Sequence, residues 1–295
     1  MLIIFKIFLT NMYLYICGKT FSDYYFKKNN NKESENAIFG TIFISFIALI
    51  VNFFLPLNKI VATFIFLIPF LIFIKKGISK KEFWFYIKAT VIVFFLIVYS
   101  DVNRPDAGLY HLPYTQILNE NKIIIGLGNL HFRFGHISIV QYLSAINHNY
   151  ITGVQGIIIP LASLVSFILI YFLDEVLIFL KKKDNLKLND IFSLFILIYI
   201  AYKINRYSGF GNDAPAHLLF FYLISVYLKS RINYDFLKKT FLIASFTFLN
   251  KVTLGLSFIF PLVIFGKLNL EKYKIFFSFS SIFILLWLIK NILIS

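Results

Sequence analysis

Acidic residues are scarce in this sequence, and charged residues of both signs are few. Asp and Glu number 14 among 295 residues, and the four charged types together make up 15% of the chain. A soluble domain carries about 25% charged residues, so this sequence has too little charge to cover a water-exposed surface. The shortage excludes an ordinary soluble globular protein.

Cysteine is limited to Cys17, which excludes an intrachain disulfide and any cysteine-based metal cluster. The four histidines of residues 101–151 do not form a metal site in place of cysteine, because they lack the spacing of helical metal-ligand pairs. We therefore predict no resident cofactor, although a divalent ion bound with help from Asp101 or Asp106 stays open.

Apolar and basic side chains, in contrast, are abundant. Hydrophobic residues make up 59% of the chain, with 38 Phe and 18 Tyr, and the mean hydropathy is +0.78. These values are typical of helices that face lipid, with aromatic rings at the interfaces. The net charge of +15 would suggest nucleic acid in a soluble protein, but here the basic residues lie in short gaps between apolar runs. Membrane topology explains that placement better, so no nucleic-acid partner is predicted.

The apolar runs predict an all-α integral membrane bundle of about ten spanning helices, which forms a single transmembrane domain over residues 1–295. A helix needs about 17 to 25 apolar residues to cross the hydrocarbon, or fewer where its ends are buried in protein. The segments are residues 2–16, 37–55, 60–74, 83–100, 152–173, 190–203, 214–228, 238–250, 252–266 and 275–290. We interpret the first as a retained helix, with a cleaved signal peptide as the alternative.

Lys and Arg alternate between the gaps of this series, and loops rich in these residues stay in the cytoplasm. The basic gaps are residues 17–36, 75–88, 174–189, 229–239 and 267–274. This orientation places the long loop, residues 101–151, on the non-cytoplasmic side. Within it, residues 109–118 and 137–146 predict short helices that lie in the interface with their apolar sides down.

A dense group of ionisable residues follows directly after segment 83–100. It contains Asp101, Asp106 and His111. An ionisable group at the mouth of a spanning helix indicates a functional site, and either aspartate could act as a general base toward a hydroxyl. The alternative is that the aspartates only solvate and cap the helix end.

A second motif, Gly126 to His136, packs glycines, two histidines and an arginine into one short stretch. Arg133 could hold a phosphate by paired hydrogen bonds, and His131 or His136 could assist it. The alternative is a structured loop whose Arg and His contact lipid headgroups.

Later in the chain, Arg206 and Asp213 precede Pro215, and Asn250 and Lys251 interrupt an apolar run. The basic-gap alternation favours a helix break at these last two residues over one long helix. A partly desolvated ammonium is costly without an anion, and a lipid phosphate would satisfy Lys251. The alternatives are that Lys251 snorkels to the interface, that Asp213 caps a helix and that His217 is an ordinary bundle residue.

The stretches Asp106-Ala-Gly-Leu-Tyr-His-Leu-Pro and Gly126-Leu-Gly-Asn-Leu-His-Phe-Arg-Phe-Gly resemble a family of bacterial polytopic membrane proteins that is distantly similar to the GT-C class of membrane glycosyltransferases. The resemblance extends loosely over the full chain. It implies an inverting transfer from a polyprenyl-phosphate-linked sugar in the bacterial cytoplasmic membrane. In that scheme Asp106, or else Asp101, acts on the acceptor hydroxyl and His111 orients it. Arg133 and Lys251 stabilise the phosphate leaving group.

The predicted function is therefore a membrane glycosyltransferase that modifies a cell-envelope glycan or lipid, with polyprenyl-phosphate-linked sugar and membrane lipid as partners. One alternative is a transporter or flippase for a lipid-linked or small anionic substrate, with broken helices at its site. Another is a non-catalytic membrane subunit that works with envelope-biosynthesis partners. An enzyme requires Asp106, His111, Arg133 and Lys251 close together, whereas a transporter requires polar residues along a path near the bilayer midplane.

Overall fold

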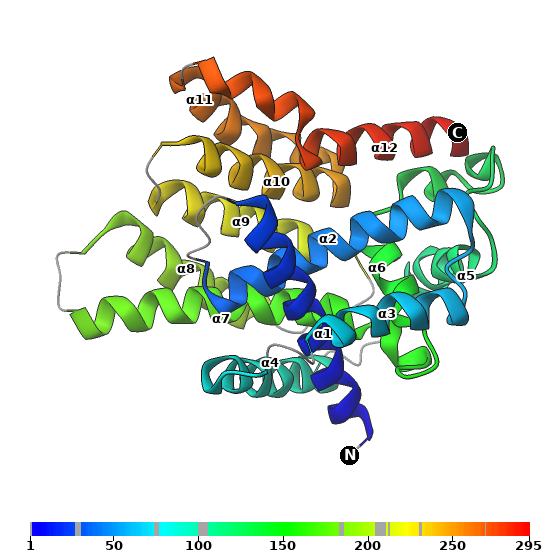
Figure 1. Ribbon diagram of the computed structural model, residues 1–295, viewed down its shortest axis with the longest axis horizontal. Helices are drawn as coiled ribbons and strands as arrows, with labels where there is room; N and C mark the ends of the chain where they lie inside the picture. Colours follow the sequence, from blue (N-terminus) through cyan, green and yellow to red (C-terminus); the bar gives the residue numbers. More distant parts are fainter. Residues whose placement is uncertain are drawn as a thin grey trace.

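The computed structural model describes residues 2–26, 31–73, 77–99, 106–182, 186–203, 211, 213–229, 232–268 and 270–295. In this part of the chain there are twelve α-helices and no strand (Figure 1). The α-helices are α1 Leu2–Tyr25, α2 Glu33–Phe54, α3 Lys59–Phe73, α4 Lys80–Tyr99, α5 Leu112–Glu120, α6 Val140–Asn147, α7 Ile159–Lys182, α8 Leu188–Lys203, α9 Asp213–Lys229, α10 Tyr234–Asn250, α11 Ile259–Lys267 and α12 Phe279–Ile294. Short π or 3₁₀ turns are η1 Ala107–His111, η2 Leu127–Asn129, η3 Phe132–His136, η4 Val154–Ile157, η6 Val252–Phe258 and η7 Leu270–Phe277.

Each of the ten predicted segments overlaps one of these helices, although segment 252–266 begins in η6 before it continues as α11. The all-α bundle is therefore confirmed. By length and composition, three helices of the described chain can cross a membrane: Leu2–Tyr25, Glu33–Phe54 and Val154–Lys181. Shorter apolar helices lie at Lys59–Leu71, Val252–Lys267 and Phe279–Ile294. The protein is therefore a helical membrane protein, while the number of about ten spans stays a prediction.

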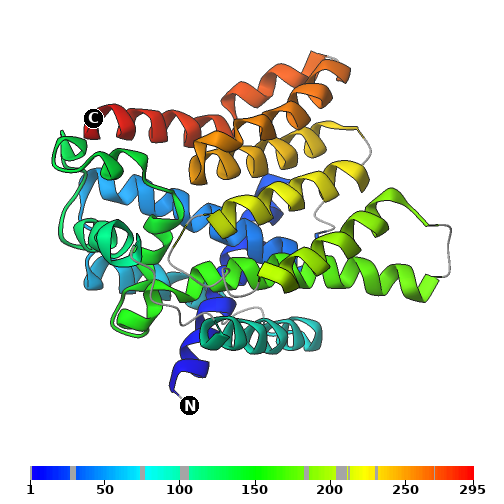
Figure 2. The ribbon, with the colours of Figure 1, turned by 180° about the vertical axis from the view of Figure 1, so that it is seen from behind.

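Helix α7 lies at the centre of the bundle and packs against α1, α2, α4, α6, α8 and α9. Figures 1 and 2 show α7, α9, α10 and α2 running alongside one another, while α1 crosses them steeply. Glycines make the α1–α2 crossing close. A Cβ on Gly18 would lie 1.7 Å from the Asn36 carbonyl oxygen, and one on Gly40 would lie 1.8 Å from that of Leu14. Only glycine fits at these two positions.

The predicted helix break is present. Helix α10 ends at Asn250, Lys251 has an extended backbone with φ −152° and ψ 107°, and η6 begins at Val252. The turn η6 then packs back against α10, and α11 continues from it. The break therefore brings Lys251 to the end of the bundle instead of the middle of a long helix.

The prediction of interfacial helices in residues 101–151 is wrong for the second of them. Helix α6 forms close to the expected place, but all eight of its residues are buried against α2, α3, α5 and α7. Its polar side chains do not face water, because Gln141 bonds to His111 and the Asn147 amide bonds to the Leu143 carbonyl. The other expected helix is present as η1 followed by α5.

The bundle has two chemically distinct ends. At the lysine end, which comprises the starts of α2, α4 and α10 and the ends of α1, α7 and α9, the basic gaps are joined by ion pairs such as Lys81–Glu33 and Lys239–Glu35. At the loop end, the segment 106–157 contacts the α2–α3 turn, the α10–η6 break and the end of α12. The amide of Gly126, for example, donates to the Leu293 carbonyl. Figure 2 shows α12 and the chain's last residue beside this loop.

Candidate functional site at the loop end

His111 is one of the buried residues of the predicted site, with 6% of its surface exposed. It ends the π turn η1, and its Nδ1 accepts a hydrogen bond of 2.7 Å from Gln141 Nε2 on α6. Burial lowers the pKa of His111, and the nearby carboxylates of Asp106 and Asp213 only partly oppose that effect. The ring is therefore neutral at pH 7, with its proton on Nε2. That nitrogen faces Gly211, where an added Cβ would lie 3.9 Å away.

Arg133 lies on the exposed surface of η3 and stacks on aromatic rings. Its guanidinium carbon is 4.7 Å from the centroid of Tyr110 and 5.6 Å from that of Phe132. Burial raises the pKa of Tyr110, the charge of Asp106 raises it further and Arg133 lowers it, so the phenol lies beside both charged groups. Arginine in such a stack is held in place while its N–H groups stay available to a ligand.

Lys251 and Asp213 form the ion pair of the loop end, with 2.6 Å between Nζ and Oδ1. The Lys251 side chain is 31% exposed and that of Asp213 is 69% exposed. Asp213 is the first residue of α9, where a carboxylate interacts favourably with the helix dipole. His217 lies one turn further along α9, on the same side as Asp213.

Five predicted site residues therefore converge, and we refer to Asp106, His111, Arg133, Asp213 and Lys251 as the loop-end cluster. The charges of Asp106, Arg133 and Asp213 all act on the His111 ring, and Lys251 joins the group through its bond to Asp213. Four separate segments contribute: η1, η3, the start of α9 and the α10–η6 break. The cluster combines carboxylates, a neutral imidazole and two cations, which is the set of groups that acid–base chemistry near a phosphate requires.

The remaining predicted site residues lie outside this cluster or outside the described chain. Asn250 is buried and bonds within the protein: its Oδ1 accepts from Ser138 Oγ at 2.8 Å, and its Nδ2 donates to the Phe246 carbonyl. His131 Nδ1 accepts from the Arg133 amide and caps η3. Asp101, Arg206 and the side chain of His136 lie outside the described residues.

No metal site emerges from the part of the chain that the structure describes, since no three of its His, Cys, Asp or Glu side chains are grouped to hold an ion. Sequence reasoning missed Tyr110 and Gln141, the partners of Arg133 and His111. Gln141 lies in segment 137–146, which was predicted only as an interfacial helix. Tyr110 lies inside the motif Asp106 to Pro113, and its place beside His111 was the available signal.

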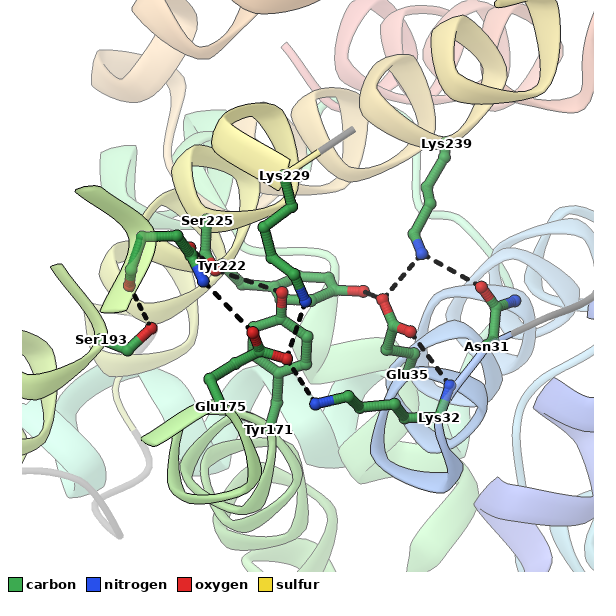
Figure 3. Close-up of polar contacts among 11 residues, drawn as sticks. Asn31, Lys32, Glu35, Tyr171, Glu175, Ser193, Tyr222, Ser225, Lys229 and Lys239 are labelled. Atoms are coloured by element: carbon green, nitrogen blue, oxygen red, sulfur yellow. Dashed lines mark hydrogen bonds and ion pairs between the residues drawn. The ribbon is translucent and has the colours of Figure 1, made fainter. Parts of the chain in front are cut away.

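A second polar cluster lies at the lysine end, and Figure 3 shows it. Glu175 on α7 is 5% exposed, and its Oε1 binds the ammonium groups of Lys32 and Lys229, the second at 2.7 Å. Its Oε2 accepts from Asn189 Nδ2 of α8 at 3.2 Å. The ring of Tyr171 lies beside both ammonium groups, with Nζ-to-centroid distances of 5.3 and 5.4 Å.

Glu35 on α2 is the other carboxylate of this lysine-end network. It is 7% exposed. Oε1 accepts from Lys239 Nζ at 2.7 Å and from the Tyr222 hydroxyl at 2.9 Å, while Oε2 accepts from the Lys32 amide at 3.0 Å. The network ties α2, α7, α8, α9 and α10 together. Little in the sequence indicated this network, because Glu35 and Glu175 lie in the basic gaps 17–36 and 174–189, just outside the predicted apolar segments.

Comparison with known proteins places the chain in a family. It has no match among curated proteins or solved structures. The model of one family, described as a domain of unknown function (DUF8201), matches residues 1–295. Because that match covers the whole sequence, the chain belongs to the DUF8201 family.

Proposed function

We propose that this protein is a membrane glycosyltransferase that uses a polyprenyl-phosphate-linked sugar at its loop end. The observation that carries the proposal is that Asp106, Arg133 and Asp213 all act on the neutral ring of His111, while Lys251 is paired with Asp213. The Asp106 to Pro113 and Gly126 to Gly135 motifs resemble a bacterial polytopic family that is distantly similar to GT-C transferases, and this resemblance supports the same chemistry.

In the proposed reaction, Asp106 takes the proton of the acceptor hydroxyl. The acceptor oxygen attacks the anomeric carbon as the bond between that carbon and the phosphate oxygen breaks. The phosphate leaves with the electron pair, and Lys251 and Arg133 stabilise its charge. His111 donates from Nε2 and orients the acceptor, because Gln141 occupies its Nδ1. Asp106 is exposed, so an acceptor can reach it from the surface.

The membrane setting supports a lipid-linked substrate. Large apolar side chains close to Arg133 in sequence are exposed, among them Leu130 at 78% and Phe132 at 68%. Exposed apolar rings beside a cation are suited to the boundary between headgroups and acyl chains. We place about ten spans in the bacterial cytoplasmic membrane, with the lysine end in the cytoplasm and the loop end outside, because basic loops are retained inside.

The test is sugar transfer by the purified protein in lipid nanodiscs, with a radiolabelled polyprenyl-phosphate sugar as donor. We expect Asp106→Asn to lower kcat by about 100-fold or more, because general-base catalysis contributes roughly 10²- to 10⁴-fold. The donor Kd should change little, since Asp106 acts on the acceptor.

Glu120→Gln provides a matched control. Glu120 is an exposed acidic residue on α5 that bonds only to Gln116 in the described chain, so its loss should leave transfer unchanged. Undiminished transfer by Asp106→Asn would remove Asp106 from catalysis. Absence of transfer by the wild-type protein with every polyprenyl-phosphate sugar offered would overturn the proposed function.

A further inference from the structure

The Lys251–Asp213 pair differs from the ion pairs of the lysine end in how easily it can separate. Asp213 is 69% exposed, and within the described residues Lys251 is its sole ion-pair partner. Water can therefore solvate the carboxylate as soon as the pair opens. Glu175, in contrast, is buried and holds two ammonium groups. An exposed pair contributes little to stability, so opening this one costs little.

The surroundings of Lys251 favour an anion in the position that Asp213 occupies. The helix break fixes the backbone of Lys251, and its ammonium has two further N–H donors beyond the one used by Asp213. The Asp213 carboxylate also lies close enough to His111 to act on its charge. An anion in the same position would therefore meet the Lys251 ammonium, with the His111 ring nearby.

We propose that Asp213 occupies an anion subsite on Lys251 and that the phosphate group of the ligand displaces it. Asp213 is then a competitor of the ligand and not part of its binding surface. The choice of phosphate rests on the proposed function, whereas the displacement rests on the geometry of the pair. Phosphate suits the position because separate oxygens can accept from the N–H groups of the Lys251 ammonium. The displaced carboxylate remains at the start of α9, where the helix dipole still stabilises it.

Competition gives Asp213 and Lys251 opposite effects on binding, which a purely structural pair would not. The Kd for a polyprenyl phosphate is measured with the full chain in nanodiscs of zwitterionic lipid. Asp213→Asn removes the competing charge and nearly keeps the size of the side chain, so we expect binding about three- to fivefold tighter. Lys251→Met removes the cation, so we expect binding about 10- to 100-fold weaker. Weaker or unchanged binding by Asp213→Asn would overturn the inference.

The control is Glu33→Gln, which removes a carboxylate from the Lys81–Glu33 pair at the opposite end of the bundle. Its Kd should equal that of the wild type, and an equal tightening there would overturn the inference, because general electrostatics would then explain both variants. A second arm uses inorganic pyrophosphate in place of the lipid. The same pattern in both arms indicates that the phosphate group alone is recognised, and the pattern in the lipid arm only indicates a phosphate held at the membrane.

Binding and transfer fail separately in this design. A protein that shows the opposite effects of Asp213→Asn and Lys251→Met but transfers no sugar keeps the anion subsite and loses the glycosyltransferase assignment. A protein that transfers sugar but binds the phosphate less tightly after Asp213→Asn keeps the assignment and loses the competition. Wild-type protein that binds neither polyprenyl phosphate nor pyrophosphate overturns the subsite.

Discussion

The two ends of the bundle use the same kinds of residue in opposite ways. At the lysine end, Glu35 and Glu175 are almost fully buried, and each accepts hydrogen bonds from three groups. At the loop end, Asp106 and Asp213 are exposed, and Arg133 rests on aromatic rings. A carboxylate whose oxygens all accept hydrogen bonds from the protein has little capacity left to bind a ligand. An exposed carboxylate with a single partner keeps that capacity. Saturation of the carboxylates, meaning that protein donors occupy all of their oxygens, therefore distinguishes a structural cluster from a candidate site.

The physical basis of the contrast is the cost of burying charge. Two buried carboxylates are tolerated only when enough donors compensate for the water that they have lost. Lys32, Lys229 and Lys239 provide that compensation, and their basic neighbours leave the lysine end positive. At the loop end solvent remains near the charges, so they need no full set of partners within the protein. That end can keep donors and acceptors free for a substrate.

Glu175→Gln is the strongest way to break the comparison, because it removes one buried charge and leaves two ammonium groups facing a neutral amide. Breaking a buried pair costs about 3–5 kcal/mol. We expect a correspondingly large drop in the midpoint of thermal unfolding in detergent, followed by circular dichroism. Asp213→Asn at the loop end should lower stability by less than about 1 kcal/mol. Equal losses in the two variants would show that saturation does not distinguish the ends.

Much of this fold could be predicted from local sequence patterns. The ten apolar segments matched helices because a run of apolar residues between basic gaps needs no distant partner to be recognised. The break at Lys251 was also predictable, since the alternation of basic gaps favoured it over one long helix. The burial of α6 could not be predicted, because polar residues at a spacing of three form the same sequence pattern whether they face water or a buried histidine.

The sequence predicted which motifs contribute to the candidate site, but not how their side chains are arranged in space. Asp106, His111 and Arg133 stood out because they are ionisable residues in a loop between apolar helices. The pairing of Asp213 with Lys251, 38 positions apart, depends on how α9 packs on α10. The lysine-end network was missed for a related reason. Lys32 joins Glu35 through its amide and Glu175 through its ammonium only when α2 and α7 lie side by side.

Lys290 is an exception at the loop end because its charge is buried. Lys290→Met tests what that burial costs. The residue is fully buried on α12, and its Nζ lies 3.9 Å from the Trp287 centroid and 2.8 Å from Asn291 Oδ1. No carboxylate pairs with it in the described chain. Because a buried ammonium without a counter-charge is costly, a methionine of similar shape should stabilise the protein by about 1–3 kcal/mol. The thermal midpoint should rise, and a fall would show that the contact with Trp287 outweighs the burial cost.

The smallest expected effect is on the pH dependence of stability, and it comes from histidines of the loop end. Burial holds the pKa of His111 below its ordinary value of 6.5, and burial acts on His148 in the same direction. Above that pH both the folded and unfolded states carry neutral rings. As the pH falls below it, the unfolded chain binds protons that the folded protein resists, so stability decreases on acidification.

His111→Gln should therefore flatten the decline of the thermal midpoint between pH 7 and pH 5, even if it lowers the midpoint at pH 7 through the altered contact with Gln141. His131→Gln serves as the control, because that ring is exposed on η3 and should leave the slope unchanged. A slope that is identical in wild type and His111→Gln would mean that the loop end does not resist protonation at His111. The neutral ring on which the acceptor geometry depends would then be lost, and Asp106 would have to act without it.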